Sequence, residues 1–254
     1  MTVDHVGVYL VPTMPELRFV GRLAFPIFAY LIAEGCHYTR SRRRYLASMA
    51  VFGALAQLVL WVGRHTFNQS IFTTFVLSIA TIYALDWWAR AANAVDTESG
   101  SGSGFGSEPA PASPVHTWRR WVNIRILAPL ATLAIDVVVS TTLPKVVPFG
   151  FYVQYRFPGV LLPVLAYLPW LTYARGETLP AAGPRRCASL ALFAVGLVVV
   201  AATGTSSSQW WSLVALVPLA LYNGERGRHV PKYFFYAYYP LHLAVIFALA
   251  AYLG

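Results

Sequence analysis

The sequence predicts an all-α integral membrane protein, a helical bundle that crosses a bilayer several times. Hydrophobic residues make up 57% of the 254 residues and charged residues only 11%, whereas an average soluble domain has about 25% charged residues. Apolar runs such as 187–203 approach the roughly 20 residues that a helix needs to cross the hydrocarbon core. These runs are continuous and lack the alternation of barrel strands. Helices are therefore expected, because a helix satisfies its own backbone hydrogen bonds in lipid.

Nine apolar segments are candidates for the helices of this bundle, and we expect about eight to nine of them to cross the membrane. The first segment is too short for a crossing, so either the natural protein starts earlier or this helix enters the bilayer only partly. It also lacks the charged start of a signal peptide. The segments are 1–11, 16–36, 45–63, 67–88, 120–142, 157–174, 187–203, 209–222 and 233–253.

The positions of the basic residues predict the orientation. Short cytoplasmic loops collect Lys and Arg, and most of the 19 basic residues of this chain fall on alternate loops. The loops assigned to the cytoplasm hold Arg40, Arg42, Arg43, Arg44, Arg90, Arg119, Arg120, Arg175, Arg185, Arg186, Arg226, Arg228 and Lys232. This pattern predicts a cytoplasmic N-terminus, nine crossings and an outer C-terminus in a bacterial cytoplasmic membrane. Because the charges are dispersed rather than gathered in one stripe, a lipid bilayer is the expected partner and nucleic acid is not.

Residues 91–117 are rich in Gly, Ser, Pro and Glu and predict a disordered cytoplasmic linker. The linker separates an N-terminal helical bundle, 1–90, from a C-terminal bundle, 118–254, and we expect both to pack in one membrane domain. The two cysteines, Cys36 and Cys187, show no metal-ligand spacing, so no metal is expected.

Asp4, His5 and Arg22 are the first polar residues in apolar segments, where each charge costs at least about 2.5–3.5 kcal/mol. If the turn at Pro12–Pro15 lies at the outer surface, His5 and Arg22 both lie roughly 10 Å deep and could face one another. A neutral imidazole can accept a proton near pH 7. The alternatives are a structural histidine and a structural Asp4–Arg22 ion pair.

A second polar group closes the segment 16–36, where Glu34 and His37 precede a basic run. Guanidinium groups beside a helix end could bind the phosphates of a nucleotide-bearing cofactor such as coenzyme A. Ordinary membrane anchoring and attraction to anionic lipid explain the same run. The basic residues concerned are Arg40, Arg42, Arg43 and Arg44.

The C-terminal half holds two further polar groups. Arg125 and Asp136 share one predicted helix face, which fits either a stabilising pair or a substrate path. Asn223 marks a turn before the basic loop with Arg226 and Arg228. An aromatic belt that includes Tyr239 follows, with Pro240 and His242 deeper in the last helix. A kinked, hydrated helix wall and a structural histidine both remain open for His242.

These segments also resemble a known family, the TraX family of membrane proteins. The resemblance rests on DHVG at 4–7, GRLAFPIFAYLIAEG at 21–35 with His37, Thr39 and the Arg-rich turn into Tyr45, LYNGERG at 221–227 and KYFFYAYYPLHLAVI at 232–246. It implies an integral membrane acetyltransferase that uses acetyl-CoA, whose best-known member N-acetylates a conjugative pilin. It also implies similarity to multipass acyltransferases with a membrane-embedded His and a nearby Arg.

Together, the residues and the resemblance lead us to expect acetyl transfer from acetyl-CoA to an amine or hydroxyl, with a small molecule or a peptide N-terminus as acceptor. The expected catalytic residues are His5, Asp4 and Arg22. His5 is the base, or an acyl carrier if transfer crosses the membrane; Asp4 orients His5 or holds its charge; and Arg22 stabilises the oxyanion or the thioester carbonyl. Coenzyme A phosphates are expected at Arg40, Arg42, Arg43, Arg44, Arg226 and Arg228, and the site lining at Glu34, His37, Asn223, Tyr239 and His242.

Two other classes remain open. A small-molecule transporter or exporter would use Arg22, Glu34, Arg125, Asp136 and His242 as pathway residues. The chain lacks the paired, interrupted hydrophobic segments expected of such transporters. A non-catalytic membrane scaffold would bind no acyl donor.

Overall fold

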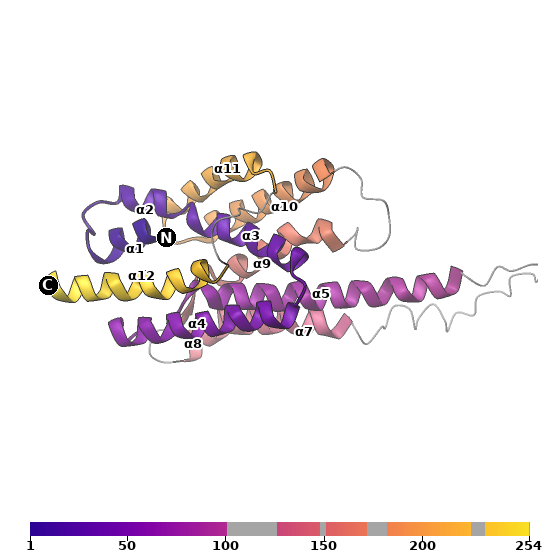
Figure 1. The fold of residues 1–254 in the computed structure, drawn as a ribbon, viewed down its shortest axis with the longest axis horizontal. Helices are drawn as coiled ribbons and strands as arrows, with labels where there is room; N and C mark the ends of the chain where they lie inside the picture. Colours follow the sequence, from indigo (N-terminus) through magenta and orange to yellow (C-terminus); the bar gives the residue numbers. More distant parts are fainter. Residues whose placement is uncertain (101–125, 148–150, 172–181, 225–231, 254) are drawn as a thin grey trace, which may run out of the picture.

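The computed structural model describes residues 1–100, 126–147, 151–171, 182–224 and 232–253, and Figure 1 shows their arrangement. Nearly all regular structure in these residues is helical, which confirms the all-α prediction. The helices are α1 (Thr2–Tyr9), α2 (Glu16–Gly21), α3 (Ala24–Tyr38), α4 (Arg42–Arg64), α5 (Ile71–Gly100), α7 (Leu127–Val137), η2 (Val138–Thr142), α8 (Leu143–Val146), α9 (Arg156–Leu171), α10 (Ala182–Thr203), η3 (Ser207–Ala215), α11 (Leu216–Leu221) and α12 (Lys232–Leu253). Two short strands, β1 (Asn68–Gln69) and β2 (Tyr152–Val153), pair in parallel.

The multipass prediction is confirmed at the level of helix length and composition. Within the described residues, 6 helical segments are long and apolar enough to cross a membrane. They are Glu16–Tyr38, Arg42–Arg64, Ile71–Arg90, Leu127–Val146, Gly183–Thr203 and Tyr233–Leu253. Many apolar side chains on their outer faces, such as Val51, Leu58 and Val199, are exposed, as expected for surfaces that contact lipid.

The predicted count of about eight to nine crossings is not confirmed. Helix α1 has 8 residues and α9 has 16, both below the roughly 20 residues of a straight crossing. The segment 209–222 divides into the 3₁₀ helix η3 and the short α11. The cytoplasmic position of the N-terminus stays a prediction.

The prediction that the disordered linker starts at residue 91 is wrong. Helix α5 continues to Gly100, so residues 91–100 are helical rather than disordered, and Figure 1 shows this helix projecting past its neighbours. The alanines that begin this stretch are strong helix formers, and the described part of the helix ends at Gly100, a residue of low helix propensity. The rest of the predicted linker, 101–117, lies outside the described residues.

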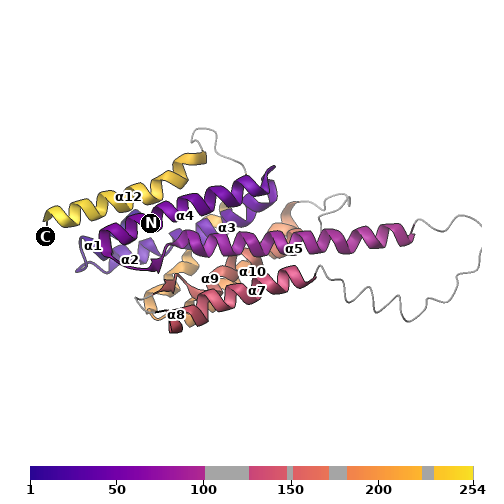
Figure 2. The same ribbon diagram turned by 90° about the horizontal axis from the view of Figure 1, so that it is seen from below.

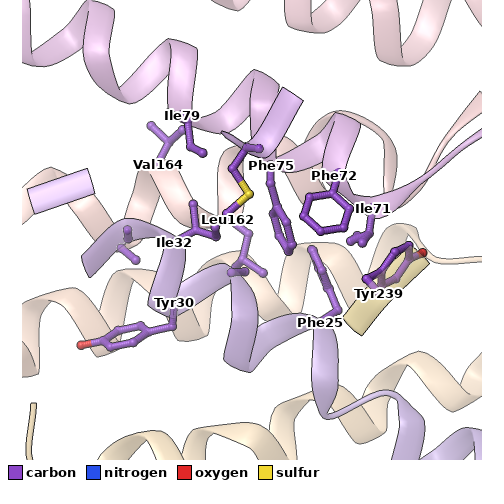
Figure 3. Packing of buried hydrophobic residues seen from close by; sticks show 14 of the residues in the cluster. Phe25, Tyr30, Ile32, Ile71, Phe72, Phe75, Ile79, Leu162, Val164 and Tyr239 are labelled. Carbon is purple, nitrogen blue, oxygen red and sulfur yellow. The ribbon is translucent and has the colours of Figure 1, made fainter. Parts of the chain in front are cut away.

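The core lies where α3, α5 and α9 meet. Its centre includes Phe25 and Ile32 from α3, Phe75 and Ile79 from α5, and Leu162 from α9, all at most 5% exposed, and Figure 3 shows several of these side chains together. Helix α10 covers α9, while α4 lies between α5 and α12. Figure 2 shows α4 and α12 on one side of the bundle and α7 and α10 on the other. The predicted N- and C-terminal bundles therefore share one hydrophobic core.

The bundle has two chemically different ends. Helices α4 and α12 run in parallel, because Phe52 stacks on Tyr236 and Gly63 approaches Phe247. Their starts, at Arg42 and Lys232, therefore lie at the same end, which we call the Arg-rich end. It also carries the basic residues Arg40, Arg43, Arg44, Arg90, Arg185 and Arg186. The loops 10–15, 65–70 and 204–206 lie at the opposite end.

Candidate functional site

A cavity of about 460 Å³ lies toward the end of the bundle opposite the Arg-rich end. Its walls come from α1, the junction of α2 and α3, the start of α5, the segment before α9, the end of α10, η3 and α12. The volume is in the range of about 300–1,000 Å³ that is usual for small-ligand sites. The polar lining residues that matter below are Asp4, His5, Arg22, Gln154, Tyr155, Arg156, Gln209 and Tyr239.

Helices α1 and α2 form a tight hairpin that brings Asp4 and His5 next to Arg22. A Cβ atom added at Gly21 would lie 2.3 Å from the Cβ of Asp4, and one added at Gly7 would lie 2.9 Å from the Cβ of Leu17. These close approaches require glycine at both positions. His5 and Arg22 line the same cavity, as expected if they face one another, and their depth in a bilayer stays a prediction.

His5 is hydrogen-bonded to His242 across the interface between α1 and α12. The distance from His5 Nδ1 to His242 Nε2 is 2.8 Å, and the distance from His242 Nδ1 to the carbonyl oxygen of Tyr238 is also 2.8 Å. A carbonyl oxygen can only accept, so His242 Nδ1 must carry the hydrogen. With both rings neutral, His242 Nε2 then accepts from His5 Nδ1–H. This arrangement leaves the Nε2 of His5 as a free lone pair, which is the atom that a general base requires.

Aromatic rings hold this histidine pair in place. The rings of His5 and His242 stack with centroids 5.0 Å apart, and the ring of Tyr239 meets both edge-on at 5.8 Å and 5.3 Å. Tyr239 is only 4% exposed and lines the cavity. His242 is not part of the cavity wall and lies behind His5, so it contributes to the site through His5 rather than by touching a ligand.

Arg22 lies beside Tyr155 at the wall formed before α9. Burial raises the pKa of the Tyr155 hydroxyl above its ordinary value, and the Arg22 guanidinium opposes that change. Tyr155 and Arg156 both have left-handed backbone conformations, with φ of 62° and 49°. Consecutive non-glycine residues in this region are costly and cluster at functional sites. Here they place the Tyr155 ring in a stack with Phe25 at 3.8 Å.

The structure gives Asp4 a different place from the one predicted. Its Oδ1 atom is buried and has no hydrogen-bond partner among the described residues, and no ion pair joins Asp4 to Arg22 in the part of the chain that the structure describes. The hydrogen-bond partner of His5 is His242 rather than Asp4. His5 is therefore held by a hydrogen bond to His242 and not to Asp4, while Asp4 lines the cavity beside it and its catalytic role stays a prediction.

Among the arginines predicted to bind coenzyme A, the described ones, Arg40, Arg42, Arg43 and Arg44, lie far from this cavity. Arg42 is paired with the buried Asp86 of α5, which also accepts from Arg90 at 2.9 Å. Arg40, Arg43 and Arg44 are exposed, and Arg226 and Arg228 lie outside the described residues. From the parallel packing of α4 and α12, His242 is level with Leu58, which is roughly 24 Å along α4 from Arg42.

The predicted lining residues divide between the two ends. Tyr239 lines the cavity and His242 lies behind His5, at the cavity end of the bundle. Glu34 and His37 lie near the end of α3, with His37 roughly 22 Å along the chain from Arg22. His37 packs on Trp170 at 4.0 Å, and Tyr222 hydrogen-bonds to Glu34. Asn223 is exposed at the turn after α11, where Gly224 has a φ of 77°. These three residues therefore form no part of the cavity wall.

Of the predicted pair Arg125 and Asp136 in the C-terminal half, the structure describes only Asp136. Asp136 is buried and accepts a hydrogen bond of 2.6 Å from Thr81 of α5. Arg125 lies outside the described residues. The observed contact joins α7 to α5 and leaves Asp136 outside the cavity lining.

Sequence reasoning missed several polar residues of the cavity wall. Gln154 and Tyr155 precede α9, Arg156 is its first residue, and Gln209 lies in the first turn of η3, next to the end of α10. All lie in or beside loops where polar residues are ordinary, so hydropathy did not mark them. A weak signal existed in Arg156, one of the few basic residues on the loops assigned to the outside.

Comparisons with known proteins agree with the resemblance seen in the motifs. The family model described as "TraX protein" matches residues 1–96 and 117–250. An uncharacterized protein of Rickettsia prowazekii (strain Madrid E) is 29% identical over 79 residues, which cover 31% of this chain and 29% of that protein. A probable fimbrial assembly protein of Dichelobacter nodosus, FimC of serogroup H1, is 42% identical over 41 residues, which cover 16% of this chain and 17% of that protein. The chain thus spans less than a third of the length of either relative, and no solved structure matches it.

Proposed function

The chain belongs to the TraX protein family, and from that premise we propose that it is an integral membrane acyltransferase that moves an acetyl group from acetyl-CoA to an amine or hydroxyl. The observation that carries the proposal is the orientation of His5. Its hydrogen bond to His242 leaves the other ring nitrogen free, in a cavity that also contains the guanidinium of Arg22.

The proposed reaction uses this nitrogen twice. The nitrogen or oxygen of the acceptor attacks the thioester carbonyl carbon while His5 Nε2 removes its proton. Arg22 stabilises the negative charge that develops on the carbonyl oxygen, an interaction strengthened by the low dielectric of the bundle. The C–S bond then breaks, and the leaving thiolate takes the proton from His5. The products are the acetylated acceptor and coenzyme A with a free thiol.

The two ends of the bundle suggest how donor and acceptor approach. By the positive-inside rule, the Arg-rich end faces the cytoplasm, where Arg40, Arg43 and Arg44 are free to contact phosphates. The cavity then lies toward the outer face and receives the acceptor. In this arrangement the phosphates of acetyl-CoA stay near the Arg-rich end while its thioester end reaches His5, a span of roughly 24 Å along α4.

The test replaces His5 with asparagine and measures release of the coenzyme A thiol from acetyl-CoA by the purified protein in detergent, with a small primary amine present as acceptor. His5→Asn is expected to lower turnover by about 10²- to 10⁴-fold, because the base is lost. The matched control is His65→Asn. His65 is exposed at the end of α4 with a φ of 48°, a conformation that asparagine tolerates, and it lies outside the cavity lining.

Turnover that is unchanged in His5→Asn would remove His5 from the mechanism. Thermal stabilisation by acetyl-CoA separates the remaining classes, since a ligand that binds the folded state raises its stability. An enzyme of this kind is stabilised by acetyl-CoA. A transporter of an unrelated molecule or a scaffold is not.

A further inference from the structure

Gln209 is the least expected polar residue of the cavity. It lies in η3, is only 4% exposed and lines the cavity. Its Nε2 atom is buried and has no hydrogen-bond partner among the described residues. Leaving a buried amide donor unsatisfied costs free energy, so such a group inside a cavity points to a ligand that accepts its hydrogen bond.

The position of Gln209 puts this donor in the same cavity, here also called the chamber, as His5, the proposed base. Helix η3 packs against α2, α3 and α10, the elements that carry Arg22 and Gly204 of the cavity wall. A Cβ at Gly204 would lie 3.2 Å from the Cγ of Gln209, so the glutamine side chain lies against the end of α10. The position of the Gln209 side chain is therefore fixed by its packing against α10.

The other polar groups that line the chamber restrict which chemical groups the ligand carries. The charged lining residues are the carboxylate of Asp4 and the guanidinium groups of Arg22 and Arg156. The Nε of Arg22 is a second buried donor that has no hydrogen-bond partner in the described part of the chain. A chamber with spare N–H donors and a base suits a polar molecule that has several oxygen acceptors and one nucleophile.

We propose that Gln209 is a specificity-determining residue that donates a hydrogen bond to a second oxygen of the acyl acceptor, so that the preferred substrates are small amines or alcohols with a neighbouring hydroxyl or carbonyl oxygen. This inference rests on the proposed acetyl transfer and names the substrate class of the same site. A site built around a buried donor discriminates strongly against an analogue that lacks the matching acceptor, because the donor is then left unpaired.

The test compares two acceptors of nearly equal size, ethanolamine and propylamine, which differ by a hydroxyl in place of a methyl group. Acetylation of each amine by acetyl-CoA is followed by mass spectrometry with the full-length protein and with Gln209→Met, which keeps the side-chain length and removes the donor. The ratio of kcat/KM values in Gln209→Met gives the intrinsic difference between the amines. The ratio of kcat/KM for ethanolamine to kcat/KM for propylamine is expected to be about tenfold higher in the wild type than in Gln209→Met.

Two controls keep the outcomes distinct. Gln69→Met removes a glutamine that hydrogen-bonds to Phe67 and Thr73 outside this cavity, and its ratio is expected to equal that of the wild type. Thermal stabilisation by each amine, without acetyl-CoA, measures binding independently of transfer. Wild type is expected to be stabilised more by ethanolamine, and Gln209→Met equally by both.

Each outcome has one meaning. Transfer to both amines with the same ratio in wild type and Gln209→Met would overturn the role of Gln209 while leaving the acyltransferase proposal intact. A Gln209-dependent binding preference without any transfer would support the subsite and contradict the transfer reaction. Neither binding preference nor transfer would overturn both.

Discussion

The hydrogen atom between His5 and His242 is positioned by an atom outside both rings, the carbonyl oxygen of Tyr238. This oxygen is one helical turn before His242, so the geometry of α12 decides the tautomer of His242 and, through it, that of His5. Pro240 lies between them in the chain and inside the helix. The partly buried His5 is thereby kept with Nδ1 in a hydrogen bond and with Nε2 available.

Replacing His242 tests this positioning role at the scale of a single residue. His242→Leu removes the acceptor for His5 Nδ1–H, so the tautomer and orientation of His5 are no longer fixed. Turnover of acetyl-CoA is expected to fall by about 10- to 100-fold, the usual effect of losing such a supporting group.

His242→Gln is the matched variant, because its amide oxygen can still accept from His5. It is expected to restore a substantial part of the activity lost in His242→Leu. Equal activity in the two variants would show that His242 only fills space, and a merely structural role predicts that result.

At the scale of elements, the hairpin of α1 and α2 is what carries the base to the cavity. Helix α1 is too short to cross a membrane and makes its contacts with α2 and α12. The two glycines at its interface, Gly7 and Gly21, let the backbones approach as closely as small residues do in membrane helix pairs.

Gly21→Ala is expected to separate α1 from α2, because the new methyl group would lie 2.3 Å from the Cβ of Asp4. Overpacking of this kind costs about 1–3 kcal/mol of stability. The thermal unfolding temperature in detergent and the turnover of acetyl-CoA are both expected to fall, because His5 moves with α1. Gly183→Ala is the control: nothing lies within 4 Å of a Cβ there, and alanine in a helix is expected to be neutral or stabilising. A Gly21→Ala protein with wild-type stability and turnover would contradict the tight hairpin.

At the scale of the whole molecule, the separation of the two ends is the main feature. The Arg-rich end is tied together by the buried Asp86, which joins α4 to α5 through Arg42 and Arg90. The cavity end is tied by the pairing of β1 with β2 and by the histidine pair. Chemistry that uses both ends must connect the two faces of a membrane.

Cysteine labelling tests the orientation of these ends. In a background with Cys36→Ala and Cys187→Ser, Ser41→Cys marks the Arg-rich end and Thr13→Cys marks the loop between α1 and α2. With a membrane-impermeant maleimide on intact cells, Thr13→Cys is expected to react and Ser41→Cys to react only after permeabilisation. The reverse pattern would place the cavity toward the cytoplasm and reject the proposed approach of the acceptor.

Much of the fold was predictable from local patterns. The apolar runs predicted membrane helices within a few residues of those observed, and the distribution of arginines separated the two ends of the bundle. The prediction failed where the pattern is not local. The run 91–100 looked like a linker by composition yet continues α5, and the segment 209–222 is apolar yet divides into two short helices.

The sequence by itself determined the class of protein and the family motifs at both ends of the chain, because the transfer of each segment into lipid depends on its own residues. Only the tertiary structure decided that His5 bonds to a histidine 237 residues away, that Asp86 holds Arg42, and that Gln209 faces the same chamber. Such contacts depend on how distant helices pack against one another, and hydropathy contains no information about which faces meet.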